Sequence, residues 1–359
     1  MNSLFHEADF EGRDVVEASF SNDSKIGGFQ AFDYFRDGSF YVLNVPGHTI
    51  GHVGALVRTT PDSQLSNNSY GALSAHVGSV EDGNLTQHTK IYTVNMKVAL
   101  VTASSAGLGA AIAKVMVFNV RVVINYSSNA SRAEALIDEL HEVASRSKAP
   151  GSDCEGSDST NVDSAVPRAV AFRADLGKRS DIEDLVSAAI KTYGRLDVVV
   201  SNGGWTRIRK FNDLDDNMDE DDWDKCFNIN VKAHMWLMKV VRPHLEATEG
   251  AFITVASVAG VKPSGSSVPY AVTKAAQIHL VKCLARIMSP KVRVNSVSPS
   301  ILMTDWGRQF PEESLNIAKE ATLLKRFATV EDVADQVRLL ALSPSITSQN
   351  IVIDAGFST

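Results

Sequence analysis

Tyr270 and Lys274 are four residues apart in the sequence, so they share one face if this segment is a helix. A tyrosine, with an ordinary pKa of about 10, is a poor proton shuttle at neutral pH, and a nearby ammonium favours its ionised form. Ser257 ends an apolar run thirteen residues earlier, where its hydroxyl could bind a substrate oxygen. Together these side chains could hold and protonate a carbonyl oxygen as negative charge develops on it.

A second candidate site is a turn of small residues, Thr102-Ala-Ser-Ser-Ala-Gly-Leu-Gly109, between an apolar run at 98–101 and a helical stretch at 110–117. In this position backbone N–H groups can approach a pyrophosphate at the N-terminus of the helix. Gly107 and Gly109 would allow that approach, because a Cβ atom would hold the phosphates away. The turn therefore predicts a dinucleotide site, to which Thr102, Ser104 and Leu108 are also assigned.

The elements that must position these residues follow a repeated pattern of strand, turn and helix. Continuous β-branched runs that alternate with helical stretches indicate a parallel sheet covered on both faces. The sequence thus predicts an α/β fold with a doubly wound parallel sheet. Strands are expected at 98–101, 120–124, 169–173, 196–201, 251–257, 292–297 and 350–354, and helices at 110–117, 133–144, 182–192, 223–241, 270–288 and 330–341.

Two polar segments interrupt this pattern. Between Arg146 and Pro167 the chain is rich in Ser, Asp and Gly, which predicts a flexible surface insertion. The acidic run from Asp213 to Asp222 is expected to be a solvated loop whose last carboxylates lie near the positive N-terminal end of the next helix.

The order of these features resembles the short-chain dehydrogenase/reductase family over residues 97–358. The glycine turn is followed by Asn202-Gly203-Gly204 after the fourth strand, by Asn230 in the next helix, and by Ser257 with the Tyr-x-x-x-Lys pair. The resemblance implies a Rossmann-type fold, a nicotinamide cofactor and catalytic roles for Asn230, Ser257, Tyr270 and Lys274. In that family the lysine also holds the cofactor ribose, and the asparagine anchors a water that passes protons to it.

The resemblance also implies further cofactor contacts. Asp175 would lie beside the adenine, and Asn202 and Gly203 beside a ribose. Pro299, Ile301 and Thr304 correspond to the segment that flanks the nicotinamide carboxamide.

The choice between NAD and NADP depends on the end of the second strand. A carboxylate there accepts hydrogen bonds from the ribose 2′-OH and repels a 2′-phosphate. This chain has Tyr126-Ser-Ser-Asn129 instead, and hydroxyls and amides accept a phosphate without repulsion. We therefore expect NADP (NADPH), with Ser127 and Ser128 as contacts, although the glycine turn itself carries no basic residue.

Three positions depart from the family pattern. Ala103 replaces the first glycine of the turn, where a Cβ would cost about 1 kcal/mol if the backbone needs a positive φ. Ser201-Asn-Gly-Gly204 replaces Asn-Asn-Ala-Gly, and Pro299-Ser300 replaces Pro-Gly. All three exchange one small residue for another, so they bear on cofactor affinity more than on the mechanism.

The segment 300–320 corresponds to the family's substrate lid. It carries several apolar side chains, and Trp205 is a further candidate at the exit of the fourth strand. These residues predict a hydrophobic, aromatic or polyketide-like ketone; alternatively, they only pack the lid. The lid residues in question are Leu302, Met303, Trp306 and Phe310.

The first 95 residues differ from the rest of the chain. The whole protein, 359 residues, has a net charge of −7; the first 95 hold five Lys and Arg residues against eleven Asp and Glu, a net −6, and five of the nine histidines. Asp37-Gly38 between two apolar runs predicts a hairpin. The stretch 10–60, with Gly47-His-Thr-Ile-Gly-His52, resembles part of a metallo-β-lactamase-type hydrolase, in which His48 would be a metal ligand.

The rest of such a metal site is missing from the sequence, because no His-x-His-x-Asp-His motif occurs and zinc catalysis needs about three protein ligands. We therefore expect no functional metal. The predicted domains are an incomplete hydrolase-like fragment at 1–65, partly β, a linker at 66–95 and a nucleotide-binding reductase domain at 96–359.

Composition limits the remaining classes. With 44% hydrophobic and 21% charged residues, the chain has the makeup of a globular enzyme rather than of a disordered or fibrous protein. Its acidic balance argues against nucleic acid or an anionic membrane as partner. Three scattered cysteines, no apolar span and no visible secretory signal favour the cytoplasm. The family resemblance implies a homo-oligomer, a dimer or tetramer, formed through the helices of Asn230 and Tyr270.

These observations predict an NADPH-dependent reductase that acts on the carbonyl or alcohol group of a small hydrophobic molecule, such as a secondary metabolite. Two alternatives stay open. One is a non-catalytic nucleotide-binding or regulatory protein on the same fold, and the other is a bifunctional hydrolase and reductase.

Overall fold

The computed structural model of the protein divides the chain into two compact units, residues 1–94 and 95–359. The insertion predicted between Arg146 and Pro167 lies almost entirely outside the described residues. The residues that the structure describes are 25–26, 29–33, 40–44, 53–57, 96–146 and 166–359.

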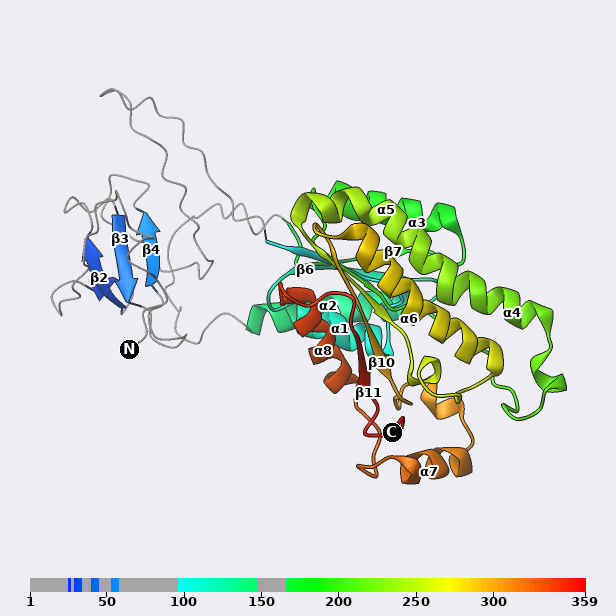
Figure 1. Ribbon diagram of the computed structural model, residues 1–359. Helices are drawn as coiled ribbons and strands as arrows, with labels where there is room; N and C mark the ends of the chain where they lie inside the picture. The colour runs from blue at the N-terminus through cyan, green and yellow to red at the C-terminus, as the bar shows by residue number, and fades with distance from the viewer. Residues whose placement is uncertain (1–24, 27–28, 34–39, 45–52, 58–95, 147–165) are drawn as a thin grey trace. The chain divides into compact units, whose positions relative to one another are not determined.

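The larger unit contains a sheet of seven parallel strands (Figure 1), in the order β11-β10-β9-β8-β5-β6-β7. The chain builds outward from β5 first on one side and then, starting with β8, on the other. In open sheets of this kind ligands bind beyond the carboxyl ends of the strands at such a switch point. The strands are β5 (Val98–Val101), β6 (Arg121–Tyr126), β7 (Ala169–Arg173), β8 (Val198–Ser201), β9 (Ala251–Val255), β10 (Arg293–Pro299) and β11 (Asn350–Ile353).

Helices cover both faces of this sheet. One apolar layer joins the sheet to α1, α2 and α8, and a second joins it to α3, α5 and α6. A shorter helix, α4, precedes α5, and α7 follows β10. Their bounds are α1 (Gly107–Met116), α2 (Ala130–Arg146), α3 (Arg179–Tyr193), α4 (Glu220–Phe227), α5 (Ala233–Thr248), α6 (Val268–Met288), α7 (Glu312–Ala321) and α8 (Val330–Leu342).

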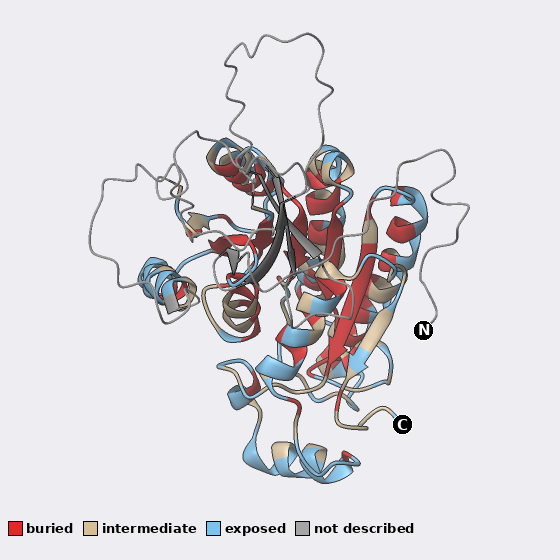
Figure 2. Ribbon diagram, turned by 90° about the vertical axis from the view of Figure 1, so that its left-hand side faces the viewer, coloured by how far each residue is buried: buried red, intermediate tan, exposed pale blue. Residues whose placement is uncertain are grey.

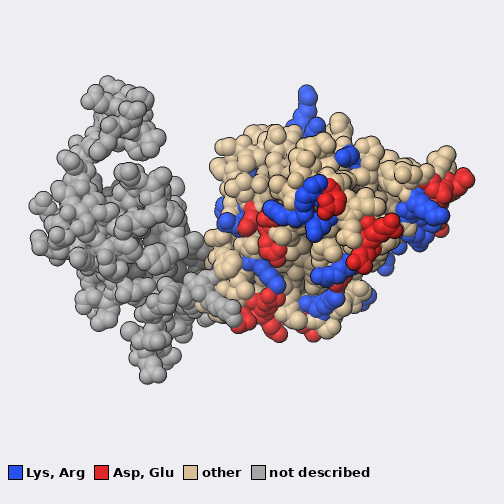
Figure 3. All heavy atoms as spheres, turned by 90° about the horizontal axis from the view of Figure 1, so that it is seen from below, with Lys and Arg blue, Asp and Glu red and all other residues tan. Residues whose placement is uncertain are grey.

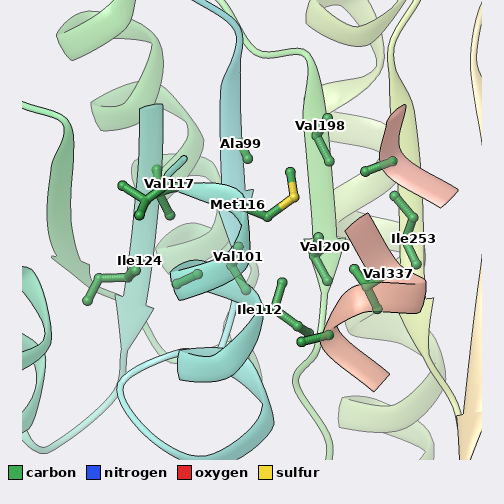
Figure 4. Packing of buried hydrophobic residues seen from close by; sticks show 14 of the residues in the cluster. Ala99, Val101, Ile112, Met116, Val117, Ile124, Val198, Val200, Ile253 and Val337 are labelled. Atoms are coloured by element: carbon green, nitrogen blue, oxygen red, sulfur yellow. The ribbon is translucent and has the colours of Figure 1, made fainter. Parts of the chain in front are cut away.

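The sheet forms the centre of the core. All residues of β5, β8 and β9 are buried, and Figure 2 shows the buried colour concentrated in the strands and on the helix faces turned toward them. Ile112 and Met116 of α1 lie next to Val101 and Val200 (Figure 4), within a cluster that Val337 of α8 also joins. The predicted doubly wound α/β fold is therefore confirmed. Within 96–146 and 166–359, no helix has both the length and the apolar character needed to cross a bilayer.

The smaller unit is described only as backbone strands. β1 (Lys25–Ile26), β2 (Phe29–Asp33), β3 (Phe40–Asn44) and β4 (Val53–Val57) form an antiparallel sheet in that order. The pairing of β2 with β3 confirms the hairpin predicted around Asp37-Gly38. His48 and its turn lie outside the described residues, so the resemblance to a hydrolase stays a prediction. The bounds of the three predicted domains stay predictions as well.

The helix predicted over 223–241 is interrupted. The chain ends α4 at Phe227, passes through a π-helical turn (Asn228–Lys232) and continues as α5. A π turn holds one extra residue per turn and is frequent at functional sites. Its side chains therefore point in different directions from those of a continuous helix, which affects Asn230 directly.

The acidic run 213–222 is only partly solvated. Asp219 caps α4 by accepting the N–H of Asp222. Asp222 itself is buried and forms ion pairs with Arg207 and Arg209. The predicted loop is therefore fixed by arginines from the preceding segment, a tertiary pairing that the spacing of the acidic residues does not reveal.

Ala103, two residues after the end of β5, has a φ of 48°. Its N–H donates to the amide oxygen of Asn125 at 3.0 Å, which helps to hold this left-handed conformation. Such a φ costs a residue with a Cβ about 1 to 2 kcal/mol, so the strain expected at the altered first position of the glycine turn is present.

Replacing Ala103 with glycine should relieve that strain. The relief offsets the greater unfolded-state entropy of glycine, so we expect the free energy of unfolding of Ala103→Gly to be unchanged or higher by up to about 1 kcal/mol. The matched control Ala110→Gly, inside α1, should lower it by about 0.5 to 1 kcal/mol. Urea denaturation measures both, and an equal loss in the two variants contradicts the strain.

Candidate active site

A large cleft, about 1360 Å³ in volume, opens at the carboxyl ends of the central strands. It is lined by the turn after β5, the ends of β6, β8, β9 and β10, the start of α6, and the segment from Pro299 to Pro311. Its position agrees with the switch point between β5 and β8, so the topology and the cleft indicate the same site.

The glycine turn forms one wall of the cleft. Gly107 has a φ of 55° and opens α1. A Cβ on Gly109 would come within 2.6 Å of the Ala103 carbonyl oxygen and 2.7 Å of the Asn202 amide nitrogen, so only glycine fits there. Ala106 to Gly109, at the N-terminus of α1, line the cleft, so the turn suits the pyrophosphate of a dinucleotide.

Thr102 ties this turn to the end of β8. Its buried hydroxyl accepts the backbone N–H of Asn202 at 2.9 Å. The Asn202 side chain donates in return to the carbonyls of Thr102 and Ala103, at 3.2 and 3.0 Å. Asn202 lines the cleft, whereas Thr102 does not. Thr102 therefore supports the wall formed by the glycine turn without reaching the cleft itself.

Ser104, predicted as a cofactor contact, does not reach the cleft. It is fully buried, and its hydroxyl donates to the Val101 carbonyl at 2.6 Å and accepts the N–H of Asn125 at 3.0 Å. It closes the turn onto β6 instead. Its neighbour Ser105 is the serine of the Ser104-Ser105 pair that lines the cleft.

Some of the other predicted cofactor residues line the cleft, and some do not. Asp175 accepts the N–H of Gly177 in an exposed turn, and neither it nor Ser128 nor Gly203 lines the cleft. A Cβ on Gly203 would come within 2.3 Å of a Leu176 methyl group, so this glycine permits packing. The predicted residues that do line the cleft are Gly107, Leu108, Gly109, Ser127, Asn202, Ser257, Tyr270, Lys274, Pro299, Ile301 and Thr304.

Arg132 contributes a positive charge near the end of β6. It lines the cleft beside Ser127 and pairs with Asp305 at 2.7 Å, both side chains being more than half exposed. Arg173, at the end of the neighbouring strand β7, donates to the Ser127 carbonyl at 3.1 Å. Neither arginine could be identified from the local sequence, since Arg132 lies beyond the four residues Tyr126–Asn129 and Arg173 belongs to a neighbouring strand.

Ser257 and Tyr270 meet on the opposite wall. Both are half-buried. They come together because Gly260 lets the segment after β9 approach α6. A Cβ on Gly260 would lie 2.5 Å from the Lys274 carbonyl carbon. Burial raises the pKa of Tyr270, while a hydrogen bond with Ser257 opposes that rise and the nearby Cys226 thiol adds to it.

The pKa of Tyr270 corrects one expectation. The spacing predicts that Lys274 lowers it, but burial dominates and the phenol stays protonated at neutral pH. The Lys274 ammonium nitrogen lies 5.6 Å from the centre of the Tyr270 ring. From that distance it can stabilise a phenolate once one forms, so Tyr270 is poised as a proton donor.

Lys274 is buried, with 3% of its surface exposed, yet it lines the cleft. Its ammonium donates to the Val255 carbonyl and to the Gln277 amide oxygen, each at 2.9 Å. Burial lowers its pKa to about 7, and the nearby Cys226 thiol opposes that shift. An ammonium held in so dry a site acts strongly on neighbouring charge.

Asn230 lies in the π-helical turn and is fully buried. Its side chain accepts the N–H of Trp205 at 2.7 Å and donates to the Trp205 carbonyl and the Thr273 hydroxyl, at 2.9 and 3.0 Å. It therefore joins α6 to the segment after β8. Gly204 lies between it and Lys274, since a Cβ there would be 3.5 Å from both side chains.

The remaining wall comes from the lid segment after β10. Thr304 covers the glycine turn, because a Cβ on Gly107 would lie 3.2 Å from its methyl carbon. All the apolar residues singled out in the sequence line the cleft, namely Trp205, Leu302, Met303, Trp306 and Phe310. Arg209 also lines it, held by Asp216, Asp219 and Asp222.

Comparisons with known proteins agree with this geometry. A family model described as enoyl-(acyl carrier protein) reductase matches residues 151–358. The chain is 32% identical over 263 residues to a ketoacyl reductase of the granaticin polyketide synthase from Streptomyces violaceoruber, covering 72% of this chain and 95% of that one. It is 33% identical to tropinone reductase-like 3 of Erythroxylum coca, covering 72% and 92%.

Solved structures share the fold. A short-chain dehydrogenase/reductase of Serratia marcescens superimposes with a TM-score of 0.62 at 25% identity, over 73% of this chain and 98% of that one. A 3-ketoacyl-(acyl-carrier-protein) reductase of Brucella melitensis, crystallised with NADH, has a TM-score of 0.60 at 22% identity over the same shares. With the glycine turn, Ser257, Tyr270 and Lys274 around one cleft, this chain belongs to the short-chain dehydrogenase/reductase family and is an oxidoreductase.

Proposed function

We propose that the protein reduces a ketone on a hydrophobic small molecule to an alcohol, with NADPH as the hydride donor. The observation that carries this proposal is the meeting of Ser257, Tyr270 and Lys274 in a cleft whose other wall is the glycine turn. A hydroxyl that can hold an oxygen, a protonated phenol and a buried ammonium are the groups that carbonyl reduction requires of a protein.

The residues of the cleft fit a dinucleotide. The open N-terminus of α1 would hold the pyrophosphate, Asn202 and Lys274 a ribose, and Pro299, Ile301 and Thr304 the carboxamide. When bound, the nicotinamide supplies a hydride to the carbonyl carbon. The apolar segment after β10 would exclude water from the reacting groups.

The protein's own residues then handle the oxygen and the proton. The Ser257 hydroxyl donates to the carbonyl oxygen and stabilises the negative charge that grows on it. Tyr270, protonated because its pKa is raised, gives its proton to that oxygen, since an alkoxide is a much stronger base than a phenolate. The Lys274 ammonium stabilises the phenolate left behind. Asn230 positions the Trp205 segment beside them.

The preference for NADPH rests on the end of β6. Arg132 and Ser127 line the cleft there, and the carboxylate that selects NAD is missing from Tyr126–Asn129. An arginine forms paired, charge-assisted hydrogen bonds with phosphate. Asp305 holds Arg132 at this place, so a 2′-phosphate would exchange one anionic partner of the guanidinium for another.

The substrate class rests on the lid. Trp205, Leu302, Met303, Trp306 and Phe310 give the cleft an apolar side toward the substrate. Relatives named for ketoacyl and tropinone reduction act on ketones by those names, which supports a ketone here. Lys and Arg alternate with Asp and Glu over the described face shown in Figure 3, which suits a small neutral substrate better than a polyanion.

Turnover decides between this proposal and a non-catalytic nucleotide-binding role. The test is NADPH oxidation with a panel of hydrophobic ketones, measured for the full chain and for a chain that begins at Met96. Cofactor binding without turnover in both would favour the non-catalytic role.

Metal analysis tests the bifunctional alternative, since stoichiometric zinc in the purified protein would support a hydrolase site.

Replacing Tyr270 with phenylalanine should abolish proton donation while the cofactor still binds. We expect kcat to fall about 10²- to 10⁴-fold with the Kd for NADPH unchanged. The control is Tyr193→Phe, which removes a hydroxyl that donates to the Pro167 carbonyl at the far end of α3 and should leave kcat unchanged. Stopped-flow turnover and fluorescence titration measure the two quantities, and full turnover in Tyr270→Phe refutes the assigned role.

The wild-type protein should use NADPH more efficiently than NADH. Arg132→Ala should lower kcat/KM for NADPH about 10- to 100-fold, as expected for loss of a hydrogen bond to a charged group, and leave that for NADH nearly unchanged. Arg242→Ala, which breaks an exposed pair with Glu246 on α5, is the control. Equal or reversed efficiencies of the two cofactors in the wild type contradict the assignment.

A further inference from the structure

Gln277 is a fully buried amide one turn after Lys274 on α6. Its side-chain oxygen accepts a hydrogen bond from the Lys274 ammonium at 2.9 Å, and its nitrogen donates to the Val255 carbonyl at 3.2 Å. Burying an amide is costly unless its groups are bonded. Both groups of Gln277 are bonded here, and the partner of its oxygen is the lysine of the active site.

The bonds of Gln277 fix its orientation. An ammonium can only donate, so the atom that faces Lys274 must be the amide oxygen. The amide nitrogen, on the other side, donates to the same Val255 carbonyl that accepts from Lys274. The three groups therefore form a closed triangle between the end of β9 and α6.

This triangle limits what Lys274 can do. An ammonium has three N–H donors, and two of them are taken by the Val255 carbonyl and Gln277. The third remains for the cleft, which Lys274 lines. A flexible four-carbon side chain with one fixed partner could still rotate; two fixed partners set the direction of the remaining donor.

We propose that Gln277 is a positioning residue for the reduction: it holds the Lys274 ammonium so that its one remaining N–H faces Tyr270 and the cofactor. The role rests on the proposed function, because it acts only through Lys274. An apolar side chain of the same size would fill the space between α6 and β9 but would leave the ammonium with one partner.

The other groups around Lys274 cannot replace Gln277. Titratable groups face it from three elements: Tyr270 on its own helix, Cys226 on α4 and His234 on α5. Burial raises the pKa of the Cys226 thiol to about 11 and lowers that of His234 to about 3. Both are therefore neutral at pH 7, so neither balances the charge of the ammonium.

The test compares two variants that change the acceptor in opposite ways. Gln277→Met keeps the volume and removes the acceptor, which disfavours the ammonium and should lower the pKa of Lys274. Gln277→Glu places a carboxylate beside it and should raise that pKa. The alkaline limb of the kcat profile should thus move to lower pH in the first variant and to higher pH in the second, by about one unit each.

At pH 7 we expect kcat of Gln277→Met to fall about fivefold, with KM for the ketone unchanged, because lowering a pKa of about 7 by one unit takes the protonated fraction of Lys274 from about a half to about a tenth. Val281→Ala is the matched control, because it opens the buried face of the same helix without contact to Lys274. It should lower stability but leave the pH profile in place.

A second readout does not depend on turnover. In protein labelled with 15N at the lysine side chains, NMR titration follows the Lys274 amine in each variant. Opposite shifts of its midpoint in Gln277→Met and Gln277→Glu support the role of Gln277 even if no ketone is reduced. Absence of ketone reduction would count only against the proposed function. A midpoint and a kcat profile equal to those of the wild type in both variants overturn the proposal.

Discussion

The active site depends on an ammonium held almost out of water. Lys274 has two protein acceptors and no carboxylate among the groups named around it, so burial shifts its pKa far below the ordinary value. This charge has a large effect on anything that comes near it, because little solvent screens it. The phenol of Tyr270, whose ring centre lies 5.6 Å away, becomes an anion when it releases its proton. The pairing thus favours proton release from Tyr270 only when an acceptor is present.

Several features of the fold bring Tyr270 and Lys274 to the cleft that the glycine turn lines. Gly260 lets the end of β9 touch α6, and Asn230 in its π turn joins α6 to the segment after β8. Thr102 and Asn202 lock the end of β8 to the turn after β5. Each link lies beyond the carboxyl end of a central strand, so the cleft is built by the strand ends and not by the lid alone. Ala103 shows that this turn holds its shape even where its backbone conformation is unfavourable.

Much of this could be predicted from local sequence, since β-branched runs, small-residue turns and helical spacing are short-range signals. The sheet, the glycine turn and the Ser257, Tyr270 and Lys274 set are examples. The predictions that failed depend on contacts between residues that are distant from one another in the chain. Ser104 serves the backbone of β6, and Asp222 is buried by arginines. A smooth helical pattern also hid the π turn at Asn230.

The pKa of Tyr270 and the role of Gln277 show the same limit. Four-residue spacing shows that Tyr270 and Lys274 share a helix face, but the pKa of Tyr270 depends on burial by other elements. Gln277 lies on the Lys274 side of α6, and nothing in its spacing tells an amide that bonds the lysine from one that faces solvent. Similarly, the positive charge at the end of β6 comes from Arg132, three residues beyond the segment that separates NAD from NADP binding.

Transfer of a labelled hydrogen tests the central claim most directly. The full chain is incubated with NADPH carrying deuterium at the transferable C4 position and with a hydrophobic ketone, and the product is examined by mass spectrometry and NMR. We expect an alcohol with one deuterium on the carbinol carbon, while its hydroxyl hydrogen comes from water through Tyr270. Cofactor binding with no deuterated alcohol from any ketone of the panel would contradict it.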